Sequence, residues 1–334
     1  MSTDRFLVLA TQKGICRFQI SQVGSLGNLE QTLKGVALEA ICRDAAGFLY
    51  AGTDRGQVYR SHDGGQGWLE VFKGFPGSRG LWSLVAHPFR PKEIYAGLEP
   101  VSLWMSRDGG EHWEELIALR KHPAAKKWHF YDPAKPHIRA IAFDRQGERL
   151  FIGIEVGGVL VSQDVGTSFE DKSKGVDEDI HTIQVVPHNP DLVFAMTGDG
   201  LFRSKDRGDH WEKLDHGLER WYMVPLAFGS ADANVLCVGA GNRPPGDWQT
   251  RGADAAIYWS EDGGDSWKVA SGPFPLRGML SSIVADPENP DHLFAGTTNG
   301  VLLQSTDDGK HWNISADNLP RIEEMVIWRS RDAK

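Results

Sequence analysis

The chain has 334 residues, is 40% hydrophobic and carries a formal net charge of -9 at pH 7. Nucleic acids and anionic membranes are bound by basic surfaces, so this charge argues against either as the main partner. Cys16, Cys42 and Cys237 are too few for a disulfide framework and lie in apolar runs, which indicates reduced core residues. The first apolar run is too short for a signal peptide or a membrane span, so we expect a cytoplasmic protein.

The first elements, residues 6–18, are two apolar runs joined by a turn. They match the second and third strands of a unit that recurs along the rest of the chain. The unit is complete at residues 81–113, where apolar runs at 81–86, 93–97 and 101–105 are followed by a tight turn and a tryptophan. Alternating residues and turn signals at this spacing predict four antiparallel strands per unit.

The turn between the third and fourth strands carries the motif Ser-x-Asp-x-Gly-x-x-Trp/Phe. Its six copies are 45, 56, 42, 56 and 45 residues apart and begin at Ser61, Ser106, Ser162, Ser204, Ser260 and Ser305. A period of this length is the signature of an array of similar units. Four-stranded units repeated around an axis form a β-propeller.

The opening segment lacks a first strand, and the last apolar run looks like a first strand with nothing after it. Together they complete one blade, and this closure removes exposed sheet edges. We therefore predict an all-β fold, a single seven-bladed propeller over residues 1–334 that is closed by its carboxy-terminal strand. The predicted blades span residues 1–34 with 322–331, then 35–75, 80–118, 136–173, 179–216, 220–271 and 278–316.

Turn chemistry accounts for every fixed position of the repeated motif. Ser and Asp side chains hydrogen-bond the backbone of a tight turn, Gly supplies positive φ, and the aromatic residue can be buried between blades. The alternative, a set of catalytic carboxylates, fails because these turns lie on separate blades and cannot converge on one substrate. We interpret the six carboxylates as structural: Asp63, Asp108, Asp164, Asp206, Asp262 and Asp307.

The six motifs resemble the Asp-box, or bacterial neuraminidase repeat, of sialidases, other glycosidases, sortilin-type receptors and photosystem II assembly factors. The resemblance covers essentially the whole chain, which is also similar to bacterial proteins described as glycosyl-hydrolase-like or sialidase-like. It implies a propeller but not one chemistry. A sialidase would add an arginine triad and an Arg-Ile-Pro segment near the start, but in this chain Phe18 follows Arg17. A true sialidase is therefore not expected.

The two spacings of 56 residues mark insertions, at residues 117–136 and 240–253. Both map to the face opposite the motifs, where the second strand of a blade turns into the third and the fourth leads into the next blade. Long loops on one rim of a rigid ring are a usual place for function. The alternative is that they are tolerated surface insertions.

First strands line the channel of a propeller. Aligned by the apolar residues that follow, their equivalent channel positions are Glu39, Trp82, Arg139, His181, Val224, Ser281 and Glu324. One pleat earlier come His137, Asp179 and Tyr222. The second strands of two adjacent blades end at Glu99 and Glu155, where no turn chemistry explains a carboxylate.

The predicted site therefore centres on blades three to five. The candidate catalytic residues are Glu99, Glu155, His137, His181 and Arg139, a set that could run general acid–base chemistry. The candidate substrate-binding residues are Trp82, Tyr222, Arg243, Trp248 and Trp128. No metal is predicted, since no compact ligand motif is present; a bound metal would use His137, His181, Glu99 and Glu155. The alternative is a polar channel mouth in which Arg139 pairs with Glu155.

Three functions stay open. The favoured one is an intracellular enzyme, a hydrolase or lyase that acts on a small polar or sugar-like molecule at the channel mouth. The second is a carbohydrate- or ligand-binding propeller without turnover. The third is a scaffold that binds a protein through its rim loops. None of the three involves nucleic acid or membrane. The cofactor is unknown, and a divalent metal is the one candidate.

Overall fold

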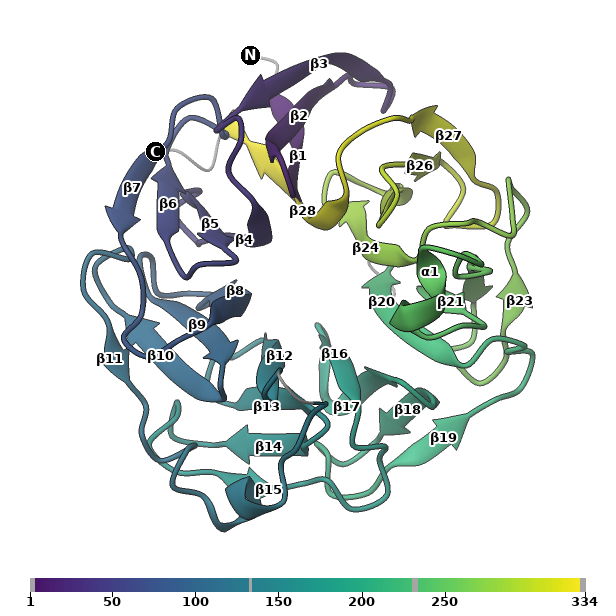
Figure 1. Ribbon diagram of the computed structural model, residues 1–334. Coiled ribbons are helices and arrows are strands. Elements are labelled where there is room, and N and C mark those ends of the chain that lie inside the picture. Colours follow the sequence, from purple (N-terminus) through teal and green to yellow (C-terminus); the bar gives the residue numbers. More distant parts are fainter. Residues whose placement is uncertain (1–3, 132–133, 230–233, 331–334) are drawn as a thin grey trace.

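The computed structural model describes residues 4–131, 134–229 and 234–330. Within them, the chain forms a ring of seven four-stranded antiparallel sheets around a central channel (Figure 1). The predicted seven-bladed propeller is confirmed. Met1, Asp132 and Arg331, which the predicted blade limits and the first insertion include, lie outside the described residues.

The strands of each blade run in order from the channel outward. Blade 1 contains β28 (Ile322–Arg329), β1 (Arg5–Thr11), β2 (Gly14–Ile20) and β3 (Leu26–Thr32). Blade 2 contains β4 (Leu38–Arg43), β5 (Leu49–Thr53), β6 (Val58–Ser61) and β7 (Leu69–Phe72). Blade 3 contains β8 (Gly80–Ala86), β9 (Ile94–Glu99), β10 (Ser102–Ser106) and β11 (Glu114–Glu115). Blade 4 contains β12 (His137–Phe143), β13 (Leu150–Glu155), β14 (Gly158–Ser162) and β15 (Glu170–Asp171).

The remaining three blades follow in chain order. Blade 5 contains β16 (Ile180–Val186), β17 (Asn189–Thr197), β18 (Gly200–Ser204) and β19 (Glu212–Leu214). Blade 6 contains β20 (Tyr222–Phe228), β21 (Leu236–Gly241), β22 (Ala256–Ser260) and β23 (Lys268–Val269). Blade 7 contains β24 (Leu280–Asp286), β25 (Asn289–Thr297), β26 (Leu302–Ser305) and β27 (Asn313–Ala316).

Two short helical turns lie in the insertions: a 3-10 turn at Pro123–Lys126 and α1 at Pro245–Trp248. No helix of the described residues is long and apolar enough to cross a membrane.

The carboxy-terminal strand closes the ring as predicted. β28 pairs antiparallel with β1, with Leu7 opposite Ile327 and Leu9 opposite Met325. Trp328 at the end of β28 is 5% exposed, and its Nε1 donates a hydrogen bond to the carbonyl oxygen of Gly47 in blade 2 at 2.8 Å. The two ends of the chain are thus joined by a sheet ladder and by one buried aromatic side chain.

The hydrophobic core is divided among the contacts between neighbouring blades. One cluster joins blades 7 and 1 and includes Leu9, Phe294 and Met325, and similar clusters join the other neighbouring pairs. The aromatic residue of each repeated motif packs into one of these clusters, as the sequence predicted; Trp312, for example, is 2% exposed between blades 6 and 7. The three cysteines are buried and unpaired.

The repeated motif is a hydrogen-bonded turn. In blade 2 the Ser61 hydroxyl donates to Asp63 Oδ1 at 2.8 Å and accepts the N–H of Gly65 at 2.9 Å. Asp63 Oδ1 then accepts the N–H of Gly67 at 2.9 Å. Gly65 has a φ of +84°, a conformation that glycine adopts without strain. The side chains therefore satisfy the backbone of their own turn, which is a structural role.

Candidate functional site

A β-bulge near the start of each innermost strand builds the channel wall. The register of β4 against β5, for example, shifts between Leu38 and Ala40, and equivalent shifts occur in the other blades. A bulge adds one residue to a strand and re-aims its side chain. The residues inside the bulges are Glu39, Trp82, Arg139, His181, Ser281 and Glu323, with Val224 and Pro225 in blade 6.

One of the sequence-based channel positions is wrong by a residue. The bulge of β28 falls between Ile322 and Glu324, so Glu323 is the equivalent of Glu39. Glu324 instead turns toward blade 2, where its carboxylate accepts the N–H of Ile41 at 2.8 Å. Burial raises the pKa of Glu324 to about 7, against the opposing effect of this hydrogen bond.

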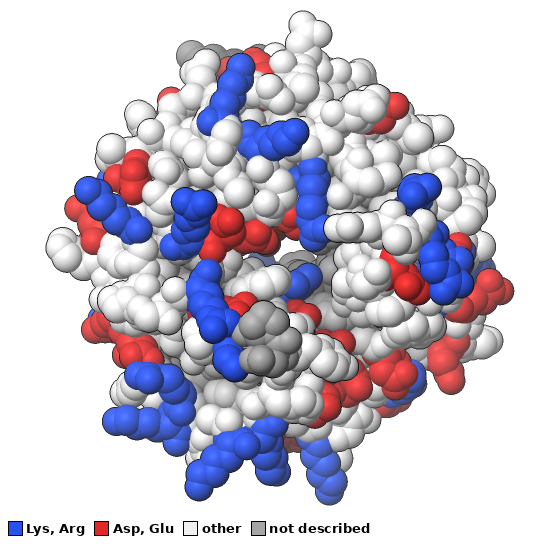
Figure 2. Space-filling view, viewed as in Figure 1, with Lys and Arg blue, Asp and Glu red and all other residues white. Residues whose placement is uncertain are grey.

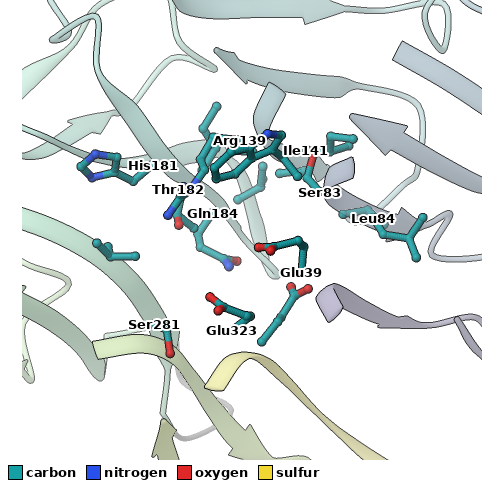
Figure 3. A pocket seen from close by; sticks show the side chains of 18 of the residues that line it. Glu39, Ser83, Leu84, Arg139, Ile141, His181, Thr182, Gln184, Ser281 and Glu323 are labelled. Carbon is teal, nitrogen blue, oxygen red and sulfur yellow. The ribbon is translucent and has the colours of Figure 1, made fainter. Parts of the chain in front are cut away.

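The bulged residues line one end of a cavity of about 520 Å³, which continues along the channel to Pro88, Arg145 and Pro187 beyond the far ends of the innermost strands. This volume lies within the range of small-molecule sites. Trp248 from the second insertion also lines the cavity, and Glu39 and Glu323 both reach into it (Figure 3). On the face drawn in Figure 2, acidic and basic side chains both border the central opening.

The acidic side of the cavity is built from three segments distant in sequence. Nε2 of Gln12, in the turn between β1 and β2, donates to Glu39 at 2.8 Å and to Glu323 at 3.0 Å. Burial and then the negative charge of Glu323 raise the pKa of Glu39 to about 7, although Gln12, Arg139 and Arg321 act in the opposite direction. Glu39 can therefore change its protonation state near neutral pH.

Sequence reasoning did not select Gln12 or Glu39 for the site. The signal for Gln12 was its register, since it directly follows the second strand of its blade, at the position that corresponds to Glu99 and Glu155 in theirs.

The basic side of the cavity is an ion-paired cluster in blade 4. Oε2 of Glu155 lies 3.0 Å from Nε2 of His137 and 3.3 Å from the guanidinium of Arg139. Burial alone would raise the pKa of Glu155, but Arg139 and His137 outweigh it and lower the pKa to about 2. The pairing of Arg139 with Glu155, which the sequence left open as an alternative, is present. A carboxylate held in this way is a poor proton donor at neutral pH.

His137 is 1% exposed and has an acceptor at each ring nitrogen. Nδ1 lies 3.2 Å from the carbonyl oxygen of Lys135, and Nε2 faces Glu155. These two contacts fix the orientation of the ring, and through Nε2 the ring orients Glu155.

Trp82 connects His137 to Glu99. Its ring stacks on the His137 ring with centroids 3.9 Å apart, and its Nε1 donates to Glu99 at 3.2 Å. Glu99 also accepts the N–H of Lys135 at 3.1 Å, at the end of the first insertion. The predicted residues Glu99, Trp82, His137 and Glu155 thus form one connected cluster. Within it, Glu99 anchors Trp82 and the insertion.

His181 has a different environment. Its Nδ1 donates to the carbonyl oxygen of Met223 at 2.6 Å, whereas its Nε2 is buried without a hydrogen-bond partner. Nε2 lies 3.5 Å from Oδ2 of Asp179. Tyr222 packs beside the ring, with centroids 4.5 Å apart. The structure therefore brings His181 together with Asp179, a residue that the sequence placed one pleat before the channel position and did not select.

The other predicted binding residues have different roles in the structure. Trp248 lines the cavity and contacts the Tyr222 ring with centroids 5.6 Å apart. Arg243 donates to the carbonyl oxygens of Arg251 at 2.9 Å and Gly252 at 3.1 Å, so its guanidinium holds the second insertion in shape. Trp128 packs against the apolar cluster between blades 3 and 4 and does not line the cavity.

The closed ring, the hydrogen-bonded Ser-x-Asp turns and the polar channel mouth define a seven-bladed β-propeller with a candidate small-molecule site. Comparison with known proteins places the fold among related propellers. A family model described as "Sortilin, neurotensin receptor 3" matches residues 157–269, which is less than half of the chain. No curated protein sequence matches the chain.

The solved structures with similar folds include the following three. The GH74 enzyme of Niastella koreensis has a TM-score of 0.71 and 15% identity over 93% of this chain and 52% of its own. The GH74 xyloglucanase of Xanthomonas campestris has a TM-score of 0.62 and 18% identity over 93% of this chain and 46% of its own. YCF48 bound to D1 peptide has a TM-score of 0.58 and 16% identity over 84% of this chain and 82% of its own. The chain thus spans about half the length of the two GH74 proteins, and identities this low show the fold alone.

Proposed function

We propose that this propeller binds a small polar, sugar-like molecule at the channel mouth opposite the Asp-box turns. The observation that carries the proposal is the ring of bulges, which directs charged and aromatic side chains from different blades into one cavity of about 520 Å³. A bulge is a feature that re-aims a side chain, and it recurs next to binding sites.

The chemistry of the cavity fits a ligand with many hydroxyl groups. Trp82 and Trp248 both line it, and Trp248 offers an apolar surface to the face of a sugar ring, whereas the Trp82 ring is stacked on His137 and has Arg139 over it. Arg139 supplies donors, and Glu39 and Glu323 supply acceptors across the cavity. Related folds include a xyloglucanase and a peptide-bound propeller, so the fold itself is compatible with either kind of ligand.

We further propose that Glu39 is the acid–base residue for a reaction of the bound molecule. Its pKa of about 7 makes both protonation states available at neutral pH, which is the requirement for a proton-transfer residue. Glu155, one of the two carboxylates that the sequence favoured with Glu99, is held as an anion by Arg139 and His137. A hydrolase or lyase reaction would therefore depend on Glu39 more than on Glu155.

The test is a thermal-shift screen of saccharides and organic acids on the purified chain, followed by calorimetric titration of each compound that shifts the melting temperature. We expect Trp248→Ala and Glu39→Gln to weaken binding about tenfold or more, the effect of losing about 1.4 kcal/mol. Trp259→Ala and Glu70→Gln are matched controls, because Trp259 packs with Lys268 and Lys310 away from the cavity and Glu70 is exposed on β7.

Turnover separates binding from catalysis. An enzyme would lose turnover in Glu39→Gln while Trp248→Ala mainly weakens affinity. A propeller that binds ligand without turnover would show the affinity losses alone. If no compound shifts the melting temperature or binds, and a protein partner co-purifies stably with the chain, the small-molecule proposal is wrong and the scaffold function stands.

A further inference from the structure

We propose that Glu155, Asp179 and His181 form a binding site for a divalent first-row transition metal ion such as Zn²⁺. One ligand atom from each of these residues lies within 4.8 Å of the others. The site lies between blades 4 and 5, at the rim of the channel. It goes beyond the proposed small-molecule function and does not depend on it.

The backbone between the two blades fixes both carboxylates. Glu155 ends β13 and forms an isolated antiparallel bridge with Asp179. Next to this bridge, the N–H groups of Gly157 and Gly158 donate to the carbonyl oxygen of Glu178 at 2.9 and 3.1 Å. The N–H of Gly198 donates to the carbonyl oxygen of Asp179 at 3.0 Å. Two acidic side chains from separate blades are thus held at one place by hydrogen bonds that do not involve the side chains.

His181 presents a free lone pair to these carboxylates. Because Nδ1 donates to the carbonyl oxygen of Met223, the neutral ring has its lone pair on Nε2. The side chain of His181 is 0% exposed, and Nε2 has no hydrogen-bond partner. The 3.5 Å to Asp179 Oδ2 is too long for a good hydrogen bond. A buried nitrogen without a partner is costly, and a metal ion would satisfy it.

The surroundings match those of known metal ligands. A histidine that binds a metal usually donates its other ring N–H to a carbonyl or carboxylate, as His181 does to Met223. His137 and Arg139 orient the Glu155 carboxylate through its Oε2. Oδ1 of Asp179 is a second buried atom without a partner. Each of the three residues therefore has either a free ligand atom or a supporting contact.

Charge and ligand type select the class of metal. Asp177 interacts with the negative charges of Asp179, Asp199 and Glu178, so this rim carries a negative potential that offsets the positive charge of Arg139. One imidazole and two carboxylates suit Zn²⁺, Co²⁺ and Mn²⁺ better than Mg²⁺ or Ca²⁺, which prefer oxygen ligands alone. Three protein ligands leave a coordination position for water, and the side chain of Asp179 is 32% exposed, which provides an entry path.

The test is a titration of the full chain with Co²⁺ and then Zn²⁺ after treatment with a chelator, without any small-molecule ligand. We expect one equivalent of Co²⁺ to bind with a visible absorption band that Zn²⁺ removes. His181→Ala and Asp179→Asn should each weaken binding at least tenfold, as loss of a metal ligand does. If His181→Ala fails to fold, Asp179→Asn alone decides, because Asp179 lies at the exposed rim.

The matched control is His210→Ala. His210 and Asp206 form an exposed imidazole–carboxylate pair, 2.6 Å apart, in the Asp-box of blade 5, where a metal could bind adventitiously. Binding that survives His210→Ala and is lost in Asp179→Asn supports the proposal. The proposal is overturned by binding that is lost only in His210→Ala, or by the absence of a one-to-one complex at micromolar Co²⁺ and Zn²⁺. Saccharide binding measured in excess chelator tests the small-molecule function separately.

Discussion

Glu39 and Glu323 accept hydrogen bonds from a single amide nitrogen, Nε2 of Gln12, at 2.8 and 3.0 Å. The first comes from blade 2 and the second from the carboxy-terminal strand of blade 1, so the pair exists only in the closed ring. Two carboxylates that face each other across one donor cannot both be anionic without cost. Burial and Glu323 accordingly raise the pKa of Glu39 to about 7 from an ordinary value of 4.5.

The first prediction concerns the pH dependence of stability. The folded state holds a proton on Glu39 between pH 4.5 and 7, whereas the unfolded state has released it. The contribution of this proton to the free energy of unfolding is therefore fully present below pH 4.5 and is lost as the pH rises through 7. Between pH 4.5 and 7 the free energy of unfolding should fall by about 1–2 kcal/mol less in Glu39→Gln than in the wild type. This value is smaller than the full pKa shift implies, because solvent in the channel screens the charge. Urea unfolding at a series of pH values measures it.

Glu324 has a pKa of about 7 from burial, so part of the decline should persist in Glu39→Gln and disappear only when Glu324→Gln is added. Glu70→Gln, on the exposed face of β7, serves as the control and should leave the slope unchanged. An equal slope in the wild type and in Glu39→Gln would contradict the assigned proton.

The second prediction concerns the ion pair of Arg139 and Glu155. Removing one partner leaves the other poorly compensated in a buried place, so Arg139→Met and Glu155→Leu should each cost about 2 kcal/mol of the free energy of unfolding. The double variant should cost less than the sum by at least about 1 kcal/mol. Unfolding in urea with excess chelator measures this coupling without interference from metal.

The exposed pair of Arg107 and Glu114, at 2.6 Å, is the matched control for this cycle. Its side chains are 65% and 56% exposed, so its coupling should stay below about 0.5 kcal/mol. Additive costs for Arg139 and Glu155 would show that the pair does not act as a unit.

The third prediction concerns the repeated Ser-x-Asp turns. The hydroxyl of Ser204 is buried, donates to Asp206 at 2.8 Å and accepts the N–H of Gly208 at 2.7 Å. Ser204→Ala leaves that N–H without a partner, so we expect a loss of about 1–3 kcal/mol in the free energy of unfolding. Ser266→Ala removes an exposed hydroxyl from the box of blade 6 and should cost under about 0.5 kcal/mol. Equal losses of unfolding free energy in Ser204→Ala and Ser266→Ala would show that the buried hydrogen bond of Ser204 does not stabilise the turn.

The fold could be predicted from the sequence because its signals are local. Ser61 and the glycines that follow it mark a turn wherever the motif occurs, and its six copies mark six of the seven blades. The closure followed from one missing strand at the start and one extra strand at the end. These inferences needed no knowledge of which side chains touch across blades.

The site was only partly predictable because its contacts cross blades. The apolar pattern found Trp82, Arg139 and His181, but a bulge changes the direction of a side chain without changing that pattern. The spacing of Ile322 and Met325 equals that of Leu38 and Ile41, and this signal would have selected Glu323 in place of Glu324. The residue that pairs with each polar side chain lies on another blade and leaves no pattern in the neighbouring sequence. Gln12 and Asp179 were therefore missed.

The fourth prediction concerns ring closure by β28. Trp328 packs against Phe6 of β1, with ring centroids 6.2 Å apart, and donates to Gly47 of blade 2 at 2.8 Å. Because it is 5% exposed and joins both ends of the chain, Trp328→Ala should cost about 3–5 kcal/mol. Trp259→Ala removes the same side chain from a partly exposed place within blade 6 and should cost much less. Thermal and urea unfolding of the two variants test this order. A smaller loss in Trp328→Ala than in Trp259→Ala would mean that the β28–β1 ladder alone holds the ring closed.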